Sequence, residues 1–188
     1  FTPLFLGFLL PIGQMLVWVT ETAQSVVNEK FFRWIGNSLI LGVTTAICVL
    51  IVAVLLVYSV RLSQSKWMQR LSKIAVLGYA IPGAIIAVGI LASFTKLDHK
   101  LSDWLEQLSG QSVGLILTGT AISLVFAYMI RFLAVAFNPI ETGFEKVANK
   151  LDEASRMLGA SPWRTLWRIN LPILKPSLLS AMLMVLWR

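Results

Sequence analysis

The residues with the most specific spacing lie in a polar segment between two apolar stretches. Glu153-Ala154-Ser155 is followed after three residues by Gly159, and after nine more by Ile169-Asn170-Leu171-Pro172. A chain that only crossed a membrane would need just a short turn here. A longer segment with charged side chains and a fixed glycine indicates a further role, and its residue types suit the binding of a partner.

Residues for covalent, acid–base or metal chemistry are scarce in the rest of the chain. The single His99 and the single Cys48 lie far apart in the sequence. Asp98, His99 and Asp103 share one segment and could offer ligands to a metal, but a solvated loop is the simpler interpretation. There is also no glycine-rich phosphate loop ending in Lys-Ser or Lys-Thr. We therefore expect no catalytic residue, no metal site and no cofactor.

The polar segment is predicted to form two short helices joined by a glycine elbow. Asn149 is suited to cap the first helix, and Gly159 stands where a left-handed residue would end it. Ser161 and Pro162 suit the cap and the first position of a second helix, which Pro172 is expected to end. The whole unit would lie at the membrane surface.

Both predicted helices are amphipathic. Leu151, Ala154 and Leu158 recur at helical spacing in the first, and Trp163 and Leu166 do so in the second. Basic amphipathic helices with tryptophans can rest in the membrane interface. A rigid projection of this kind also fits a groove in a partner. The residue types alone leave both interpretations open.

The composition indicates a membrane protein. Hydrophobic residues make up 57% of the 188 residues and charged residues 13%, whereas soluble domains have about 45–50% and about 25%. A spanning helix needs about 20 apolar residues. Four uncharged stretches reach that length and a fifth is shorter: 1–20, 36–60, 74–95, 108–130 and 176–187. We expect an all-α, polytopic membrane helical bundle with four complete spans and a truncated fifth.

Basic residues predict the orientation of these spans. Segment 61–73 holds four basic residues and no acid, and segment 131–175 holds seven basic residues. The other two loops hold four basic residues with five acidic ones. By the positive-inside rule, 61–73 and 131–175 are cytoplasmic. The net charge of +7 is then explained by topology and contact with membrane lipid, without nucleic acid.

One predicted span contains an irregularity. Pro82 removes a backbone donor, so the helix through 74–95 is expected to kink or open just before it. Tyr79, Pro82 and Gly83 could then border a translocation pathway or its gate, although a kink made for packing explains them equally well. None of the four long stretches contains an ionisable side chain, which argues against a proton-coupled carrier.

The polar segment resembles the EAA loop of the permease subunits of bacterial type I ABC importers. In that family the pattern is Glu-Ala-Ala, three residues, Gly, nine residues, Ile, one residue and Leu-Pro. The present chain departs from it only at Ser155. The run that begins at Gly159 and ends at Trp163 is also similar to the family.

The resemblance covers most of the chain and is strongest to the ferric-iron branch. It is carried by Asn37-Ser38-Leu39, Tyr79-Ala80-Ile81-Pro82-Gly83, Tyr128-Met129-Ile130-Arg131-Phe132 and Asn138-Pro139-Ile140-Glu141. Importers of thiamine, polyamines or phosphonates are similar and remain alternatives for the substrate.

The resemblance implies a multi-pass protein of the bacterial inner membrane that forms the translocation pathway. Its implied partners are a cytoplasmic ATP-binding subunit, a periplasmic or extracellular substrate-binding protein and a second permease unit, fused or separate. ATP would be hydrolysed by the partner, so the chain itself would not be an enzyme. Residues 1–35 would form a first span with its external loop. Residues 36–188 would form a core permease domain with a coupling loop at 139–175, within a longer protein.

Site residues follow from the same resemblance. Those implied to couple to the ATP-binding subunit are Glu153, Ala154, Ser155, Gly159, Ser161, Pro162, Trp163, Leu166, Ile169, Leu171 and Pro172. In this group Gly159 would supply the bend, Glu153 would make polar contacts, and Trp163 with Leu166 would anchor the loop. Those implied to line the pathway or its gate are Tyr79, Pro82, Gly83 and Tyr128.

Two other classes of protein stay open at this point. A secondary transporter or channel would be expected to carry charged or paired polar residues within its spans. A membrane enzyme would need a nucleophile, an acid and a base, or a metal cluster, near one interface.

Overall fold

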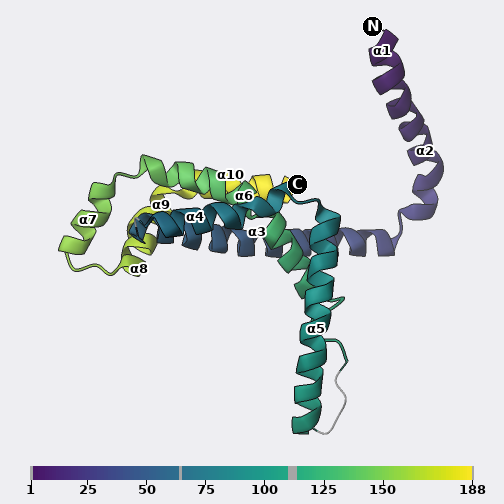
Figure 1. Ribbon diagram of the computed structural model, residues 1–188. Helices are drawn as coiled ribbons and strands as arrows, with labels where there is room; N and C mark the ends of the chain where they lie inside the picture. Colours follow the sequence, from purple (N-terminus) through teal and green to yellow (C-terminus); the bar gives the residue numbers. More distant parts are fainter. Residues whose placement is uncertain (1, 64, 110–113, 188) are drawn as a thin grey trace. The chain divides into compact units, whose positions relative to one another are not determined.

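The chain is mainly helical in the part that the computed structural model describes, residues 2–63, 65–109 and 114–187 (Figure 1). No strand occurs among these residues. The chain divides into two compact units, Phe1–Ile40 and Leu41–Arg188. The prediction of an all-α membrane fold is therefore confirmed.

The first unit is an apolar helical segment followed by the start of a second helix. It consists of α1 (Thr2–Leu4), the π-helical η1 (Phe5–Leu9), α2 (Leu10–Val26) and the first residues of α3 (Glu29–Ser63). Large apolar side chains along it are exposed, among them Leu6, Leu16 and Trp18. An exposed apolar surface of this kind suits a lipid environment. The stretch Phe5–Ala23 is long and apolar enough to span a membrane, as predicted for 1–20.

The second unit holds the remaining elements. After α3 come α4 (Lys66–Ala75), the 3-10 helix η2 (Val76–Ala80), α5 (Gly83–Ser109), α6 (Ala121–Lys146), α7 (Asn149–Met157), α8 (Pro162–Thr165), the π-helical η3 (Leu166–Asn170), α9 (Leu171–Ile173) and α10 (Lys175–Trp187). The 35 residues of α3 extend about 52 Å at 1.5 Å per residue. This exceeds the hydrocarbon thickness of about 30 Å, so the helix is long enough to project from the membrane.

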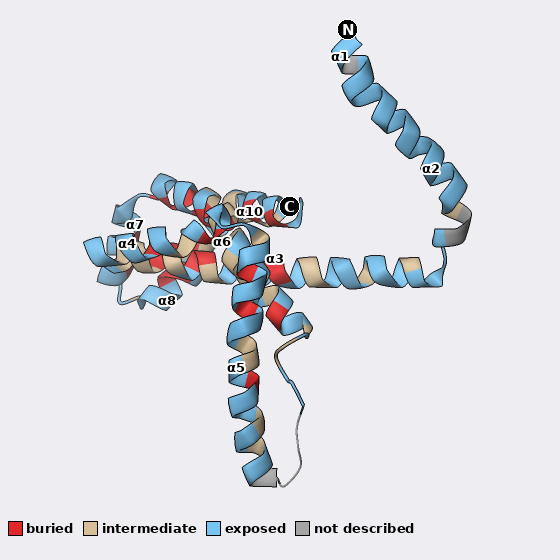
Figure 2. Cartoon of the chain, turned by 45° about the vertical axis from the view of Figure 1, so that its right-hand side comes forward, coloured by how far each residue is buried: buried red, intermediate tan, exposed pale blue. Residues whose placement is uncertain are grey.

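The core of the second unit lies between α3, α6 and α10. Figure 2 shows buried residues gathered where these helices pack. Val49 and Ala53 of α3, Ala136 and Ile140 of α6, and Ala181 of α10 belong to one cluster of buried apolar side chains. Small residues allow helix backbones in a membrane to approach closely. The predicted helical bundle is thus formed by these three helices, with alanines where they pack.

Proline divides the span predicted at 74–95 more sharply than a kink. The helical axis turns by 110° between Lys66–Ala80 and Gly83–Gln107, with the break at Ile81 and Pro82. Ile81 is in the extended region, which is favoured for a residue that precedes proline. The pair forms either a broken span or a re-entrant loop by length and composition. The expected opening just before Pro82 is confirmed, and the bend is larger than a kink.

The span predicted at 108–130 has the wrong bounds, because the helix begins later, at Ala121, and continues to Lys146. Residues 114–120 are irregular, and Thr120 is extended just before α6. Asp98 explains this: its carboxylate accepts hydrogen bonds from the backbone N–H groups of Ile116, Leu117 and Thr118 at 3.1, 2.8 and 2.6 Å. These donors are satisfied without a helix.

This shift corrects two further predictions. Asp98 was expected in a solvated loop, but its side chain is only 1% exposed. Arg131 was expected in a cytoplasmic segment, but it lies within α6, which as a whole is long and apolar enough to span a membrane. Each of the three helices that could span a membrane contains at least one ionisable residue, with Glu21 in the first, Arg61 in the second and Arg131 in the third.

In total, three helices of the described part could each cross a membrane: Phe5–Ala23, Glu29–Ser63 and Ala121–Lys146. Two bent pairs could add to them, namely the pair broken at Pro82 and the pair Pro162–Ile173 with Lys175–Trp187.

Candidate functional site

The polar segment forms two helices joined at a glycine turn, as predicted. Gly159 has a φ of +79°, in the left-handed region that glycine adopts without strain. The N–H of Gly159 bonds to the carbonyl of Arg156 at 2.9 Å, and that of Ala160 bonds to the carbonyl of Ser155 at 3.0 Å. This pair of bonds is a Schellman motif, which satisfies the last carbonyl groups of α7. Residues 149–170 are called the elbow unit below.

The second helix of the elbow unit starts where the sequence predicted. The hydroxyl of Ser161 accepts a hydrogen bond from the backbone N–H of Arg164 at 3.3 Å, and Pro162 is the first residue of α8. Ser161 is thus an N-cap, and proline occupies the position where a missing N–H costs nothing.

Two details of the elbow unit differ from prediction. The residue that precedes α7 is Ala148, with no side-chain cap, and Asn149 is already the first helical residue. The chain also continues as a helix through Pro172, which falls in the first turn of α9. Proline is tolerated there because the first N–H groups of a helix have no partner within it.

The interior of the elbow unit is polar. Asp152, Ser155, Thr165 and Asn170 are all buried. Ser155 Oγ donates to the carbonyl of Asp152 at 2.9 Å and shares a hydrogen bond of 2.7 Å with Thr165 Oγ1. Asn170 Nδ2 donates to Asp152 Oδ1 at 3.1 Å. The serine that departs from the family pattern therefore joins the two arms of the elbow.

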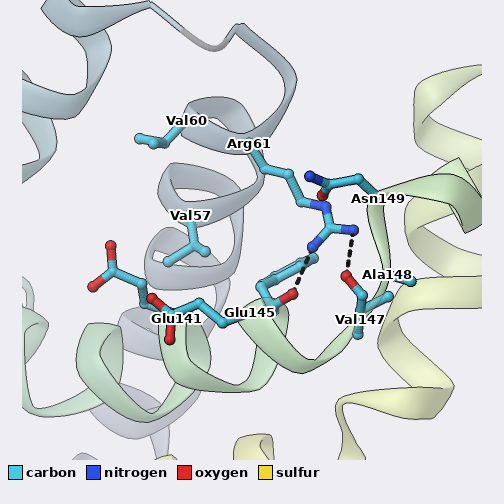
Figure 3. A pocket seen from close by; sticks show the side chains of 9 residues that line it. Val57, Val60, Arg61, Glu141, Glu145, Val147, Ala148 and Asn149 are labelled. Carbon is cyan, nitrogen blue, oxygen red and sulfur yellow. Dashed lines mark hydrogen bonds between the residues drawn. The ribbon is translucent and has the colours of Figure 1, made fainter. Parts of the chain in front are cut away.

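An arginine of α3 fastens this unit to the bundle. Arg61 Nε donates to Asp152 Oδ2 at 2.6 Å, and the two side chains are 12% and 9% exposed. The two terminal nitrogens of Arg61 donate to the carbonyls of Phe144 and Val147 at 2.6 and 2.8 Å. Figure 3 shows the guanidinium reaching from α3 toward these carbonyls at one end of a pocket of about 410 Å³. Phe144 lies in the last turn of α6 and Val147 is its C-cap, at the end of a helix where carbonyl groups are short of partners within the helix.

A tyrosine of the same helix holds the second arm. Tyr58 OH donates to the carbonyl of Pro162 at 2.7 Å. Its ring also stacks on that of Phe144, with centroids 6.0 Å apart. Because Arg61 follows Tyr58 by three residues, both side chains leave α3 on the same face.

The outer surface of the elbow unit is apolar at the turn. Met157 and Leu158 are 89% and 88% exposed. Glu153 and Ala154 are exposed on the same helix. Side chains this apolar are rarely left so open unless something covers them. Of the residues of α7, Asp152 and Ser155 point inward, while the apolar Leu151 and Ala154, and Leu158 just after the helix, are exposed.

The second arm exposes two aromatic rings. Trp163 and Trp167 are 58% and 56% exposed and meet edge to face, with centroids 5.8 Å apart. Together with apolar side chains of α3 they line a cavity of about 240 Å³. Tryptophan at such a position is typical of a membrane interface as well as of a protein interface.

The residues expected to couple thus fall into an outer and an inner set. Exposed side chains are Glu153, Ala154, Ser161, Pro162, Trp163 and Pro172, and Gly159 is exposed at the turn. Ser155 and Leu166 are 5% and 1% exposed, so neither is placed to touch a partner directly. Ile169 and Leu171 are half-buried.

Sequence reasoning missed the supports of the elbow unit, which are Tyr58, Arg61, Asp152, Thr165 and Asn170. Arg61 was counted only as a basic residue of a loop. Asp152 stands beside Glu153 in the sequence, and nothing there marks it as the buried acid of the two. Neither spacing nor periodicity reveals such a pairing across 91 residues.

Of the residues expected at a pathway or gate, Tyr79, Pro82 and Gly83 lie at the break between η2 and α5, and Tyr128 lies on α6. A Cβ at Gly83 would collide with the guanidinium of Arg131 on α6. Tyr128 stands on α6 with its ring 5.8 Å from that of Phe132, and Tyr79 is 42% exposed. A cavity of about 390 Å³ between α5 and α6 is lined by residues that include Ile81, Phe126 and Ile130, but by none of the four.

Metal ligands do not gather in the part of the chain that the structure describes. No three His, Cys, Asp or Glu side chains come together there. The carboxylate of Asp98 accepts hydrogen bonds from the backbone N–H groups of residues 116–118. The neighbouring Asp103 is exposed.

Comparison with known proteins shows the family of the chain. Residues 50–187 match the family model described as the binding-protein-dependent transport system inner membrane component. This range contains the elbow unit, the core of α3, α6 and α10, and the break at Pro82.

Three relatives illustrate the range of named substrates. FbpB 1 of Haemophilus influenzae, named as a ferric transport system permease protein, is 29% identical over 146 residues, which is 78% of this chain and 21% of that protein. PhnV of Salmonella typhimurium, named for 2-aminoethylphosphonate transport, is 26% identical over 145 residues, 77% of this chain and 49% of that protein. The spermidine/putrescine permease PotB of Haemophilus influenzae is 25% identical over 170 residues, 88% of this chain and 58% of that protein.

The chain spans about a fifth of the ferric relative and about half of the others. The family match covers most of the chain itself, in a membrane-spanning helical fold with the predicted loop. The relatives are named as permease proteins, so the chain is a permease component rather than an enzyme. The chain belongs to the family of inner membrane components of binding-protein-dependent transport systems, the permeases of ABC importers.

Proposed function

We propose that this permease component forms part of the translocation pathway of an ATP-driven importer and that its elbow unit docks into a cytoplasmic ATP-binding subunit. The single observation that carries this proposal is the contrast between the two sides of the elbow unit. Its interior is fixed by buried hydrogen bonds, while Met157 and Leu158 project almost fully exposed. A rigid apolar projection is what insertion into a groove requires.

The outer residues then divide the work of docking. Leu158 and Met157 would enter the groove, Glu153 would make polar contacts at its rim, and Trp163 would add apolar area beside them. Ser155 and Leu166 would support the projection from within. The turn at Gly159 would present the apolar tip at a fixed angle, because the Schellman motif defines the backbone there.

The other proposed partners follow from the family description. A binding protein outside the membrane would deliver the substrate, as the term binding-protein-dependent implies, and a second permease unit, fused or separate, would complete the pathway. We propose ferric iron as the substrate, because FbpB proteins of two organisms are similar to this chain. Phosphonates and polyamines are the alternatives, supported by PhnV and PotB.

Uptake by cells that lack the chromosomal permease tests the function and the substrate together. Radiolabelled ferric iron, 2-aminoethylphosphonate and spermidine are offered in parallel, with the intact permease gene supplied on a plasmid. We expect restored uptake of ferric iron that requires ATP. Restored uptake of another compound would contradict the choice of substrate. Restored uptake that continues without ATP would favour a secondary transporter or channel.

A pair of variants connects uptake with the elbow unit. Leu158→Asp places a charge on the apolar tip and is expected to abolish uptake, whereas Leu158→Met keeps the tip apolar and is expected to preserve it. The side chain is 88% exposed, so neither change should disturb the fold. Equal uptake by both variants would mean that the tip rests in the membrane interface and binds no subunit.

A further inference from the structure

The firmest side-chain attachment of the elbow unit is to a helix far away in the sequence. Arg61 and Asp152 are separated by 91 residues, and Tyr58 and Pro162 by 104. Both donors belong to α3, which is joined to the elbow unit by no direct chain connection. We infer that the Ser63 end of α3, through Tyr58 and Arg61, is the point where movement of the elbow unit enters the membrane helices. This inference rests on the proposed function.

Arg61 acts as a junction of three elements. Its guanidinium bonds at once to the last turn of α6, to the linker carbonyl of Val147 and to Asp152 of α7. A planar guanidinium fixes the directions of all these bonds, which an ammonium group does not. It also lies over the ring of Phe144, 5.5 Å from the centroid. Movement of α7 therefore displaces α3 and α6 together.

Asp152 extends this junction to the second arm. One carboxylate oxygen accepts from Arg61 and the other accepts from Asn170. Both acceptor oxygens are used within the protein, and Asp152 is 6% exposed. Removing one member of such a buried pair leaves an uncompensated charge. The pair is therefore expected to persist while the elbow unit moves.

Tyr58 supplies a second point of attachment one turn along α3. Two hydrogen-bonded points on the same face, one to each arm of the elbow, prevent the unit from rotating about a single contact. The residues that precede Tyr58 on this helix, among them Ala46, Val49, Ala53 and Val57, pack in the core with α6 and α10. A displacement at Arg61 is thus passed along a packed helix rather than lost in a loop.

The test follows a residue of α3 far from the elbow while nucleotide drives the ATP-binding subunit. A Cys48→Ala, Val43→Cys background carries an environment-sensitive bimane label at residue 43. This residue lies 15 positions before Tyr58, about 22 Å along the helix. The complete transporter, with its ATP-binding subunit, is placed in proteoliposomes, and MgATP with vanadate is the probe. The bimane emission is expected to shift on addition of this nucleotide.

Three variants decide whether Tyr58 and Arg61 carry the shift. We expect Arg61→Gln to abolish most of the emission shift, because the variant loses the charged contact with Asp152. Tyr58→Phe, which removes one hydroxyl, should reduce it less. Ser59→Ala is the matched control, because the hydroxyl of Ser59 donates to the carbonyl of Leu55 within its own helix. The ATP-binding subunit should stay bound in all three, since the outer face of the elbow unit is unchanged.

The outcomes separate this inference from the proposed function. A shift that persists in Arg61→Gln and Tyr58→Phe, or is absent from the parent while the subunit is bound, overturns the role of α3 and leaves the docking proposal intact. If Arg61→Gln fails to reach the membrane, Tyr58→Phe against Ser59→Ala decides the question alone. Failure of the subunit to bind the unaltered permease would instead overturn the proposed function, and this inference with it.

Discussion

At the scale of single residues, the sequence predicted a left-handed backbone at Gly159. Its place after an amphipathic stretch and before Ser161-Pro162 indicated a left-handed end to a helix, and the φ of +79° confirms it. A Cβ there would meet open space, with no atom within 4 Å. The constraint on this position is therefore set by the backbone and not by crowding within the chain.

We predict that Gly159→Val lowers the free energy of unfolding by about 1–2 kcal/mol, the cost of a left-handed backbone for a residue with a Cβ. Gly159→Asn is the matched control and should cost less, because asparagine visits this region more readily. Thermal unfolding of the purified permease in detergent compares the two. Equal stability of Val and Asn variants would show that the turn relaxes to another conformation.

Buried polar pairings are what the sequence could not predict at this scale. Asp98 appeared as one more charge in a polar segment, yet it receives three backbone N–H groups from residues 116–118. The pairing of Arg61 with Asp152 joins distant parts of the chain in the same way. Periodicity and capping rules describe neighbours in sequence, so they carry no information on these partners.

At the scale of elements, the helices around the elbow were predictable and their packing was not. The two short helices and the break at Pro82 follow from glycine, serine and proline signals. The amphipathic pattern of α7 located a helix but not the orientation of its faces. Asp152 and Ser155 are its buried residues, and Asp152 pairs there with Arg61 of the neighbouring α3, while Leu151 and Ala154 are exposed.

The start of α6 shows the same limit. A long uncharged stretch suggested a span at 108–130, but the backbone of residues 116–118 is bound by Asp98 and the helix begins at Ala121. Apolar composition does not distinguish a helix from a loop whose backbone N–H groups donate to a carboxylate. Because α6 runs from Ala121 to Lys146, Arg131 lies inside the helix and not at its cytoplasmic end.

We predict that Asp98→Ala exposes the backbone of residues 116–118 to solvent exchange. The N–H groups of these three residues would lose the carboxylate that accepts their hydrogen bonds. Hydrogen exchange with mass spectrometry should show faster exchange in this segment. Asp103→Ala is the matched control, since Asp103 is exposed. Unchanged exchange in Asp98→Ala would contradict the assigned role of the carboxylate.

At the scale of the whole molecule, orientation rests on the distribution of basic residues. The contact of Arg61 with Asp152 joins the two predicted cytoplasmic segments, 61–73 and 131–175, which agrees with their placement on one side of the membrane. The family match confirms an inner membrane protein. The side on which the elbow unit lies remains a prediction from the positive-inside rule.

We predict that a cysteine at position 103 reacts with an impermeant maleimide from outside the cell and that one at position 149 reacts only after the membrane is opened. Asp103→Cys and Asn149→Cys are made separately in a Cys48→Ala background, which removes the single native thiol. Both native side chains are exposed, so access is set by the membrane. The reverse labelling pattern would overturn the orientation and, with it, the cytoplasmic placement of the elbow unit.

The central claim is that the exposed tip of the elbow unit binds an ATP-binding subunit. Its most direct test is copurification in detergent of that subunit with the unaltered permease, with Leu158→Met and with Leu158→Asp, all at equal membrane abundance. The account predicts stoichiometric recovery with the first two and its loss with Leu158→Asp. Recovery that is equal for all three, or absent for all three, would contradict docking through this tip.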